Sequence, residues 1–177
     1  MAELLDQASI LEALADLAGD LRSRGVLADI YLVDGAAMAL AYDDRRATRD
    51  LDGLLRPDVE VHRAAWAVAE RRGLPRSWLN DQAASYVPKG DDHGARTVFD
   101  HANLRVMAAS PERMLAMKVN AARRSDIDDI VALATMLNLT TFDEVEVIRR
   151  AAFPDLALDE RRRLVVEDAI ERVRQRR

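Results

Sequence analysis

Two aspartates separated by a single residue, Asp50 and Asp52, are the part of the sequence best suited to chemistry. Side chains alternate along a β-strand, so on a strand both carboxylates would lie on the same face. Two negative charges this close repel each other, and burying them without a partner is costly. A divalent cation such as Mg²⁺ or Mn²⁺ removes that repulsion, and Mg²⁺ commonly bridges one or two carboxylates to substrate phosphates. The pair therefore predicts a metal site, formed by Asp50 and Asp52, that serves a phosphorylated substrate.

A glycine turn and a short helix are expected just upstream of the aspartates. The apolar run 30–33 ends at Asp34-Gly35, and an alanine-rich stretch begins at Ala36. Backbone N–H groups at the start of such a helix bind phosphate well. We therefore expect Gly35 and Ala36 to contact the phosphates of a nucleotide while the aspartates hold the metal.

Two arginines, Arg46 and Arg49, flank the aspartate pair. They either neutralise the two carboxylates or bind phosphate oxygens, for which the planar guanidinium group is well shaped. Thr48, between them, is more simply a β-branched strand residue.

A second group of candidate residues lies in the C-terminal half. Lys89 and Lys118 are the only lysines among 26 basic residues. Lys118 shares the apolar face of a predicted helix, where it either extends to the surface or pairs with a carboxylate or phosphate. Asp126 and Asp129 follow in the first turn of the next predicted helix, where the helix dipole stabilises acids. Either that effect explains them, or one of them pairs with Lys118 or completes a metal site.

The composition excludes several classes of protein. The chain has 177 residues, of which 49% are hydrophobic, and no cysteine, which excludes disulfides, thiolate catalysis and cysteine-based zinc sites. No apolar run is long enough to span a membrane, and the acidic N-terminus is unlike a secretory signal, so we expect a cytoplasmic protein. The net charge of -5 argues against general coating of nucleic acids. The arginine-rich tail after residue 160 is either a solvated helix end or a patch for RNA phosphate or an acidic protein.

The periodicity and capping residues predict an α+β fold with a short mixed β-sheet flanked by helices and a helical C-terminal half. Ser110 and Ser125 are expected to cap two of the helices. We expect a core over residues 1–109 and a helical part over 110–177, packed together as a single compact unit. The predicted strands cover 30–33, 48–55, 97–99 and 104–106, and the predicted helices cover 3–24, 36–42, 58–72, 110–123, 125–138, 141–151 and 159–174.

The order of these segments resembles the DNA polymerase β-like nucleotidyltransferases, and more narrowly their bacterial AbiEii/MenT-type group, which is associated with toxin–antitoxin pairs. The segments 32–40 and 46–52 carry the broader resemblance. Three further blocks support the narrower one: Leu74-Pro75 with Trp78-Leu79-Asn80-Asp81, Ser110-Pro111-Glu112 with Leu115-Ala116-Met117-Lys118, and Asp126-Ile127-Asp128-Asp129-Ile130.

The resemblance implies a minimal nucleotidyltransferase fold and metal-dependent transfer of a nucleoside monophosphate from an NTP to a hydroxyl group. Asp50 and Asp52 would hold Mg²⁺ or Mn²⁺, and Lys118 with Asp126 or Asp129 would match the family's later lysine and aspartate. In the toxin branch the acceptor is the 3′ end of tRNA, and an antitoxin protein neutralises the enzyme.

Two features depart from the family pattern. Relatives carry Gly-Gly or Gly-Ser in the phosphate turn, whereas this chain has Asp34-Gly35, whose carboxylate either points away from the triphosphate or weakens its binding. The family's third carboxylate, on a later strand, has Asp100 as its nearest candidate. Two alternatives to the RNA-modifying toxin therefore stay open: a small-molecule nucleotidyltransferase, and a catalytically impaired relative that binds a protein or a nucleotide.

Overall fold

The computed structural model describes residues 4–176 and has the α+β fold that the sequence predicts. The chain divides into two units: one contains the residues up to Ser85 together with Ala95–Ala109, and the other contains Tyr86–Gly94 together with the chain from Ser110 onward. The chain therefore passes between the units three times.

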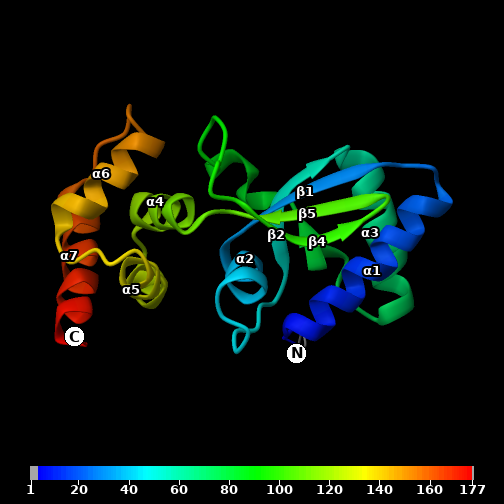
Figure 1. The fold of residues 1–177 in the computed structure, drawn as a ribbon, viewed down its shortest axis with the longest axis horizontal. Helices are drawn as coiled ribbons and strands as arrows, with labels where there is room; N and C mark the ends of the chain where they lie inside the picture. Colours follow the sequence, from blue (N-terminus) through cyan, green and yellow to red (C-terminus); the bar gives the residue numbers. More distant parts are fainter. Residues whose placement is uncertain (1–3, 177) are drawn as a thin grey trace. The chain divides into compact units, whose positions relative to one another are not determined.

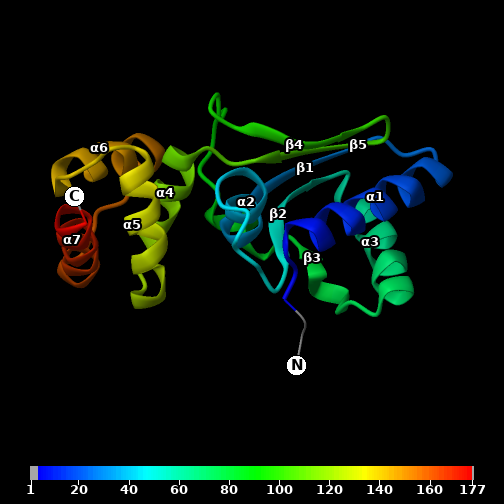
Figure 2. The same ribbon diagram turned by 60° about the horizontal axis from the view of Figure 1, so that its bottom comes forward.

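The first unit is built on a five-stranded mixed sheet with the strand order β3-β2-β1-β5-β4 (Figures 1 and 2). β1 pairs antiparallel with β2 and parallel with β5; β3 is parallel to β2, and β4 is antiparallel to β5. The elements of this unit are α1 (Gln7–Ser23), β1 (Ala28–Val33), α2 (Asp34–Ala41), β2 (Leu51–Arg56), α3 (Asp58–Arg72), the 3-10 turn η1 (Arg76–Trp78), β3 (Leu79–Asn80), β4 (Arg96–His101) and β5 (Leu104–Ala108).

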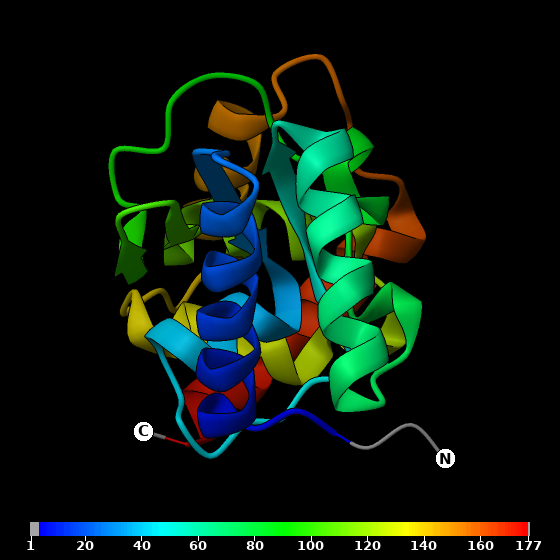
Figure 3. The ribbon, with the colours of Figure 1, turned by 90° about the vertical axis from the view of Figure 1, so that its right-hand side faces the viewer.

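One face of the sheet is covered by α1 and α3, which lie side by side (Figures 2 and 3). Burial alternates along β1, as expected for a sheet with one covered face: Ile30 and Leu32 are buried, whereas Asp29 is exposed and pairs with Arg105 of β5 at 2.8 Å. The helix α2 follows β1 directly and contacts β1, β2 and β5.

The predicted strands are confirmed in this unit, with two differences. The second strand begins at Leu51 instead of residue 48, and Thr48 forms an isolated antiparallel bridge with Leu5. The two-residue strand β3 lies in a stretch for which the sequence predicts no strand, and two residues are too few to give a detectable alternation.

The candidate for the third carboxylate, Asp100, is far from the aspartate pair. Asp100 lies opposite Arg105, whereas Asp52 lies opposite Val33. Since Arg105 is level with Asp29, Asp100 is at the other end of the sheet from the aspartate pair, and its assignment as a third carboxylate is wrong.

The second unit is helical, and its first helix, α4 (Pro111–Ala121), begins where the sequence predicts. The Ser110 hydroxyl accepts a hydrogen bond from the Arg113 N–H at 3.1 Å. The segment Tyr86–Gly94 is bound to this helix start. Its Asp92 carboxylate accepts a bond from the Ser110 N–H at 2.8 Å, and its carbonyls at Pro88, Gly90 and Asp91 accept bonds from the Arg113 guanidinium.

The prediction that Ser125 caps the next helix is wrong. The Asp126 carboxylate accepts a hydrogen bond from the Arg123 N–H at 3.0 Å, and the chain first forms the 3-10 turn η3 (Arg124–Asp126). The helix α5 (Ile127–Met136) then follows. Asp126, and not Ser125, is the N-cap residue of α5, but its side chain makes no capping hydrogen bond to that helix; its carboxylate instead holds the start of the turn η3.

The last two helices are α6 (Phe142–Ala152) and α7 (Glu160–Gln175), with Thr141 and Asp159 as their capping residues. Four arginines of α7 form ion pairs with acids three or four residues away, which favours a solvated helix end over a free basic patch. The pairs are Arg162–Asp159, Arg163–Glu167, Arg172–Asp168 and Arg174–Glu171. Within residues 4–176, none of the helices is long and apolar enough to cross a membrane.

Candidate active site

The turn from β1 into α2 forms one side of the candidate site. Asp34 has a φ of 59°, in the left-handed region that non-glycine residues rarely adopt but that aspartate tolerates better than most. Gly35 is helical, and its role is steric: a Cβ there would lie 2.7 Å from the Thr48 hydroxyl oxygen. The N-cap residue is Val33, whose side chain accepts no hydrogen bond, so the first N–H groups of α2 have no side-chain cap.

The aspartate pair forms the other side of the site. Asp50 directly precedes β2 and Asp52 is its second residue, so the two side chains share a face while Leu51 between them is buried. Strand pairing places Asp52 opposite Val33, which ends β1 and leads into α2. The sheet therefore brings the start of α2 next to both carboxylates.

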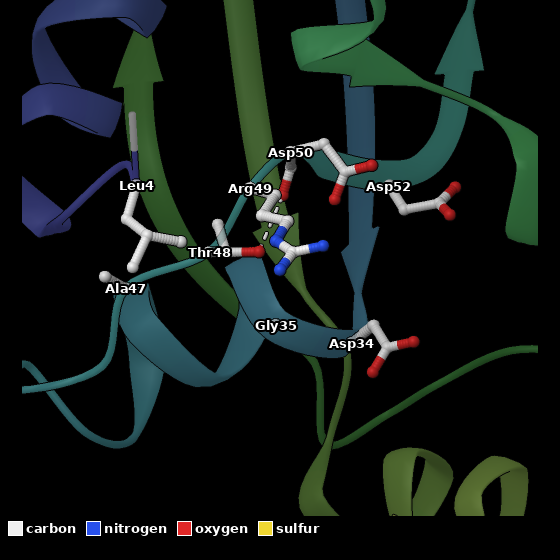
Figure 4. A pocket seen from close by; sticks show the side chains of 8 residues that line it. All are labelled: Leu4, Asp34, Gly35, Ala47, Thr48, Arg49, Asp50 and Asp52. Atoms are coloured by element: carbon white, nitrogen blue, oxygen red, sulfur yellow. Dashed lines mark hydrogen bonds between the residues drawn. The ribbon is translucent and has the colours of Figure 1, made fainter. Parts of the chain in front are cut away.

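These two sides line one pocket of about 360 Å³ (Figure 4). The carboxylates of Asp34, Asp50 and Asp52 point towards the same side of the site in Figure 4, and the guanidinium group of Arg49 lies between Gly35 and Asp50. The lining residues are Leu4, Asp34, Gly35, Ala47, Thr48, Arg49, Asp50 and Asp52.

The electrostatics of the pocket favour a bound cation. Burial raises the pKa of Asp52 above its ordinary value, and the nearby charges of Asp50 and Asp34 raise it further. A hydrogen bond of 2.9 Å from the Ala83 N–H to the Asp52 carboxylate partly offsets this increase in pKa. Burial and acidic neighbours thus disfavour the charged form of Asp52, and a divalent cation with oxygen ligands would relieve this.

Two of the four predicted nucleotide-binding residues line the pocket. Gly35 and Arg49 line the pocket, and Ala36 is buried within the first turn of α2. Arg46 forms an ion pair with Asp43 at 3.5 Å and is not among the lining residues.

The predicted residues of the C-terminal half form a cluster of their own in the second unit. The Lys118 ammonium lies 3.3 Å from the Asp126 carboxylate and 2.9 Å from that of Asp129. Only 13% of the Lys118 side chain and 8% of the Asp126 side chain are exposed, so this is a largely buried ion pair. Both aspartates pair with the lysine, where the sequence suggested that one of them would.

Asn80 was not predicted as a site residue, although it belongs to one of the blocks that carry the resemblance. It is only 6% exposed, and its side-chain amide donates to the Asp50 carboxylate at 3.2 Å. In the sequence, the only available signal is a polar asparagine directly after the apolar Trp78-Leu79.

Comparison with known families agrees with this arrangement. The model of a family described as nucleotidyltransferases of unknown function, DUF6036, matches residues 9–173. The chain belongs to this nucleotidyltransferase family. No curated protein and no solved structure matches the chain significantly.

The match spans both units of the chain, so it includes the carboxylate pair as well as the Lys118 cluster. Membership supports the nucleotidyltransferase resemblance; it does not distinguish the AbiEii/MenT-type group. Among residues 4–176, no three histidine or acidic side chains are grouped as a complete metal site. A metal at Asp50 and Asp52 would therefore take its remaining ligands from substrate oxygens and water, as Mg²⁺ commonly does.

Proposed function

We propose that the protein is a metal-dependent nucleotidyltransferase that transfers a nucleoside monophosphate from an NTP to a hydroxyl group at the 3′ end of tRNA. The observation that carries this proposal is the pair of half-buried carboxylates, Asp50 and Asp52, beside the uncapped start of α2. The raised pKa of Asp52 supports a cation there, and the N–H groups of the helix start support an anion next to it. A metal–triphosphate complex combines the two.

Each group of the pocket has a role in this scheme. Bound Mg²⁺ or Mn²⁺ would bring the triphosphate oxygens together and neutralise their charge. Asp50 and Asp52 hold the metal, the first N–H groups of α2 face the phosphates, and Arg49 binds a phosphate oxygen through its guanidinium group. Catalysis then consists mainly of positioning and charge neutralisation.

The reaction is a substitution at the α-phosphorus. The acceptor hydroxyl oxygen forms a bond to that phosphorus, and the bond from the phosphorus to the oxygen bridging to the β-phosphate breaks. Pyrophosphate leaves with the electron pair, and the hydroxyl proton passes to solvent.

The tRNA acceptor, the role as a toxin and the partner antitoxin rest on the resemblance to the AbiEii/MenT-type group. The ion-paired arginines of α7 add no support for RNA binding. Asp34, which brings a third negative charge to the pocket, favours the alternative of a catalytically impaired relative.

The decisive experiment measures transfer of label from each of the four α-³²P NTPs to total bacterial tRNA, with Mg²⁺ or Mn²⁺. The unmodified protein is compared with the double variant Asp50→Ala/Asp52→Ala and with Asp155→Ala, which removes an exposed aspartate from a loop of the second unit. Labelled tRNA is expected with the unmodified protein and with Asp155→Ala only. Growth arrest on expression should follow the same pattern if the protein is a toxin.

Label that survives in the double variant would refute the assignment of the aspartates. If no NTP gives labelled tRNA but Mg-NTP binds to the unmodified protein and not to the double variant, the acceptor is a small molecule or the protein is an impaired relative. Addition of candidate hydroxyl acceptors separates these two, because only an active transferase releases pyrophosphate.

A further inference from the structure

The loop that follows β3 contacts both carboxylates of the aspartate pair. The Asn80 side-chain amide donates to Asp50 Oδ2 at 3.2 Å, and the Ala83 backbone N–H donates to Asp52 Oδ1 at 2.9 Å. β3 is parallel to β2, with Asp52 opposite Asn80, so the sheet itself fixes this loop beside the two aspartates. Each carboxylate has two oxygens, so each keeps a second oxygen that these two donors do not occupy.

The amide of Asn80 is itself rigidly held. Its nitrogen also donates to the Ser77 carbonyl at 3.2 Å, and its oxygen accepts from the Gln82 N–H at 3.1 Å. The turn that carries it is anchored by Trp78, which is fully buried and donates from its indole N–H to the Ala65 carbonyl of α3 at 2.9 Å. The amide therefore has one available orientation, with its nitrogen towards Asp50.

We infer that Asn80 is a positioning residue of the metal site, and that with the Ala83 N–H it orients Asp50 and Asp52 so that one oxygen of each faces the metal. This inference rests on the proposed function. An amide nitrogen is a donor and cannot ligate a cation, so Asn80 acts only through the carboxylate that it holds. Removal of a hydrogen-bond partner of this kind commonly lowers metal affinity or activity by about 10- to 100-fold.

The positions of Leu79 and Asn80 in β3 allow an effect on the metal site to be separated from an effect on the core. Leu79, the neighbour of Asn80 in β3, is buried on the opposite face of the strand and packs in the core. Asn80 instead directs its hydrogen bonds to the turn and to Asp50. Loss of the amide should therefore weaken metal binding more than it weakens the fold.

The test is Mn²⁺ binding, measured by the electron paramagnetic resonance signal of free Mn²⁺ in titrations of the full-length protein. The variants are Asn80→Ala and, independently, Ala83→Pro, which removes the donor to Asp52 in the first turn of the 3-10 helix Gln82–Tyr86, where proline is best tolerated. The matched control is Asn103→Ala. Asn103 also donates its amide to a backbone carbonyl, that of Val26, but it lies at the other end of the sheet.

We expect the Mn²⁺ dissociation constant to rise about 10-fold or more in Asn80→Ala and in Ala83→Pro, and to stay unchanged in Asn103→Ala. Circular dichroism establishes that each variant is folded. In the transfer assay, excess Mn²⁺ should restore the kcat of Asn80→Ala, which a loss of folded protein would not allow.

Two results would overturn the inference in different ways. If folded Asn80→Ala and Ala83→Pro bind Mn²⁺ as tightly as the unmodified protein, the positioning role is refuted while the metal site stands. If the unmodified protein binds no Mn²⁺, or if Asp50→Ala/Asp52→Ala binds it equally well, the metal site itself is refuted and the role of Asn80 with it.

Discussion

Substitution of Gly35 by alanine tests the close approach between α2 and the segment that carries the aspartates. The added Cβ would lie 2.7 Å from the Thr48 hydroxyl oxygen and 3.3 Å from the Thr48 Cβ. Both distances are shorter than the ~3.5 Å at which non-bonded heavy atoms attract most strongly. Thr48 cannot easily move, because its hydroxyl donates to the Asp50 carbonyl at 3.0 Å and its backbone exchanges two hydrogen bonds with Leu5.

The expected magnitude combines two opposing effects. Replacing glycine by alanine within a helix stabilises it by about 0.5–1 kcal/mol. Overpacking against a fixed neighbour costs about 1–3 kcal/mol. We therefore expect Gly35→Ala to lower the free energy of unfolding by about 1 kcal/mol. Gly19→Ala is the matched control: Gly19 lies within α1, and a Cβ there meets nothing within 4 Å, so this variant should gain about 0.5–1 kcal/mol.

Urea unfolding followed by tryptophan fluorescence suits this comparison. Both tryptophans, Trp66 and Trp78, belong to the same unit as the two glycines. The midpoint should shift in opposite directions in the two variants, with the slope unchanged. Adding Thr48→Ala to Gly35→Ala removes the clashing oxygen and should recover part of the loss. If Gly35→Ala is stabilised as much as Gly19→Ala, the close contact with Thr48 does not exist in solution.

Three further predictions concern single side chains. Glu146→Gln should destabilise the second unit by about 3 kcal/mol in thermal unfolding, because it leaves the Arg149 guanidinium, which is 1% exposed, without its bidentate carboxylate; an unchanged midpoint would contradict this. In EDTA, Asp52→Asn should raise the free energy of unfolding at pH 7. The gain should shrink as the pH falls through the raised pKa of Asp52, where the unmodified carboxyl also becomes neutral, and a gain independent of pH would refute burial of the Asp52 charge as its cause. Ser110→Ala should lower the free energy of unfolding by about 1 kcal/mol in chemical denaturation, because it removes a capping hydroxyl. Ser125→Ala should lower it far less, and equal losses in the two variants would contradict the finding that Ser125 is not a capping residue.

The helical half of the chain is well predicted where local chemistry determines the structure. Ser110 caps the helix that the sequence assigns to it, because a capping residue acts on N–H groups two or three positions away. Thr141 and Asp159, predicted as the first residues of the last two helices, are the capping residues directly before them. The error at Ser125 has the same local origin. Two capping residues, Ser125 and Asp126, stand side by side, and only the structure reveals that the longer carboxylate reaches Arg123.

The candidate site could be predicted in part. Asp50, Asp52 and Gly35 are recognisable because their spacing within the chain already implies a shared face and a turn. Asn80 could not be placed in the site, because its contact with Asp50 depends on a two-residue strand pairing across some thirty residues of chain. The position of Asp100 likewise depends on sheet register, which local sequence does not determine.

The interleaved path of the chain restricts how the protein can be divided or recombined. A fragment that starts at Ser110 lacks the segment Tyr86–Gly94, and with it the Asp92 carboxylate and the carbonyls that hold Arg113. A chimera that exchanges the helical half between two relatives at one crossover would join each α4 to a foreign version of this segment. Inheritance of the helical half therefore requires a second, separate stretch of the gene to travel with it, so these two stretches should change together as the family diverges.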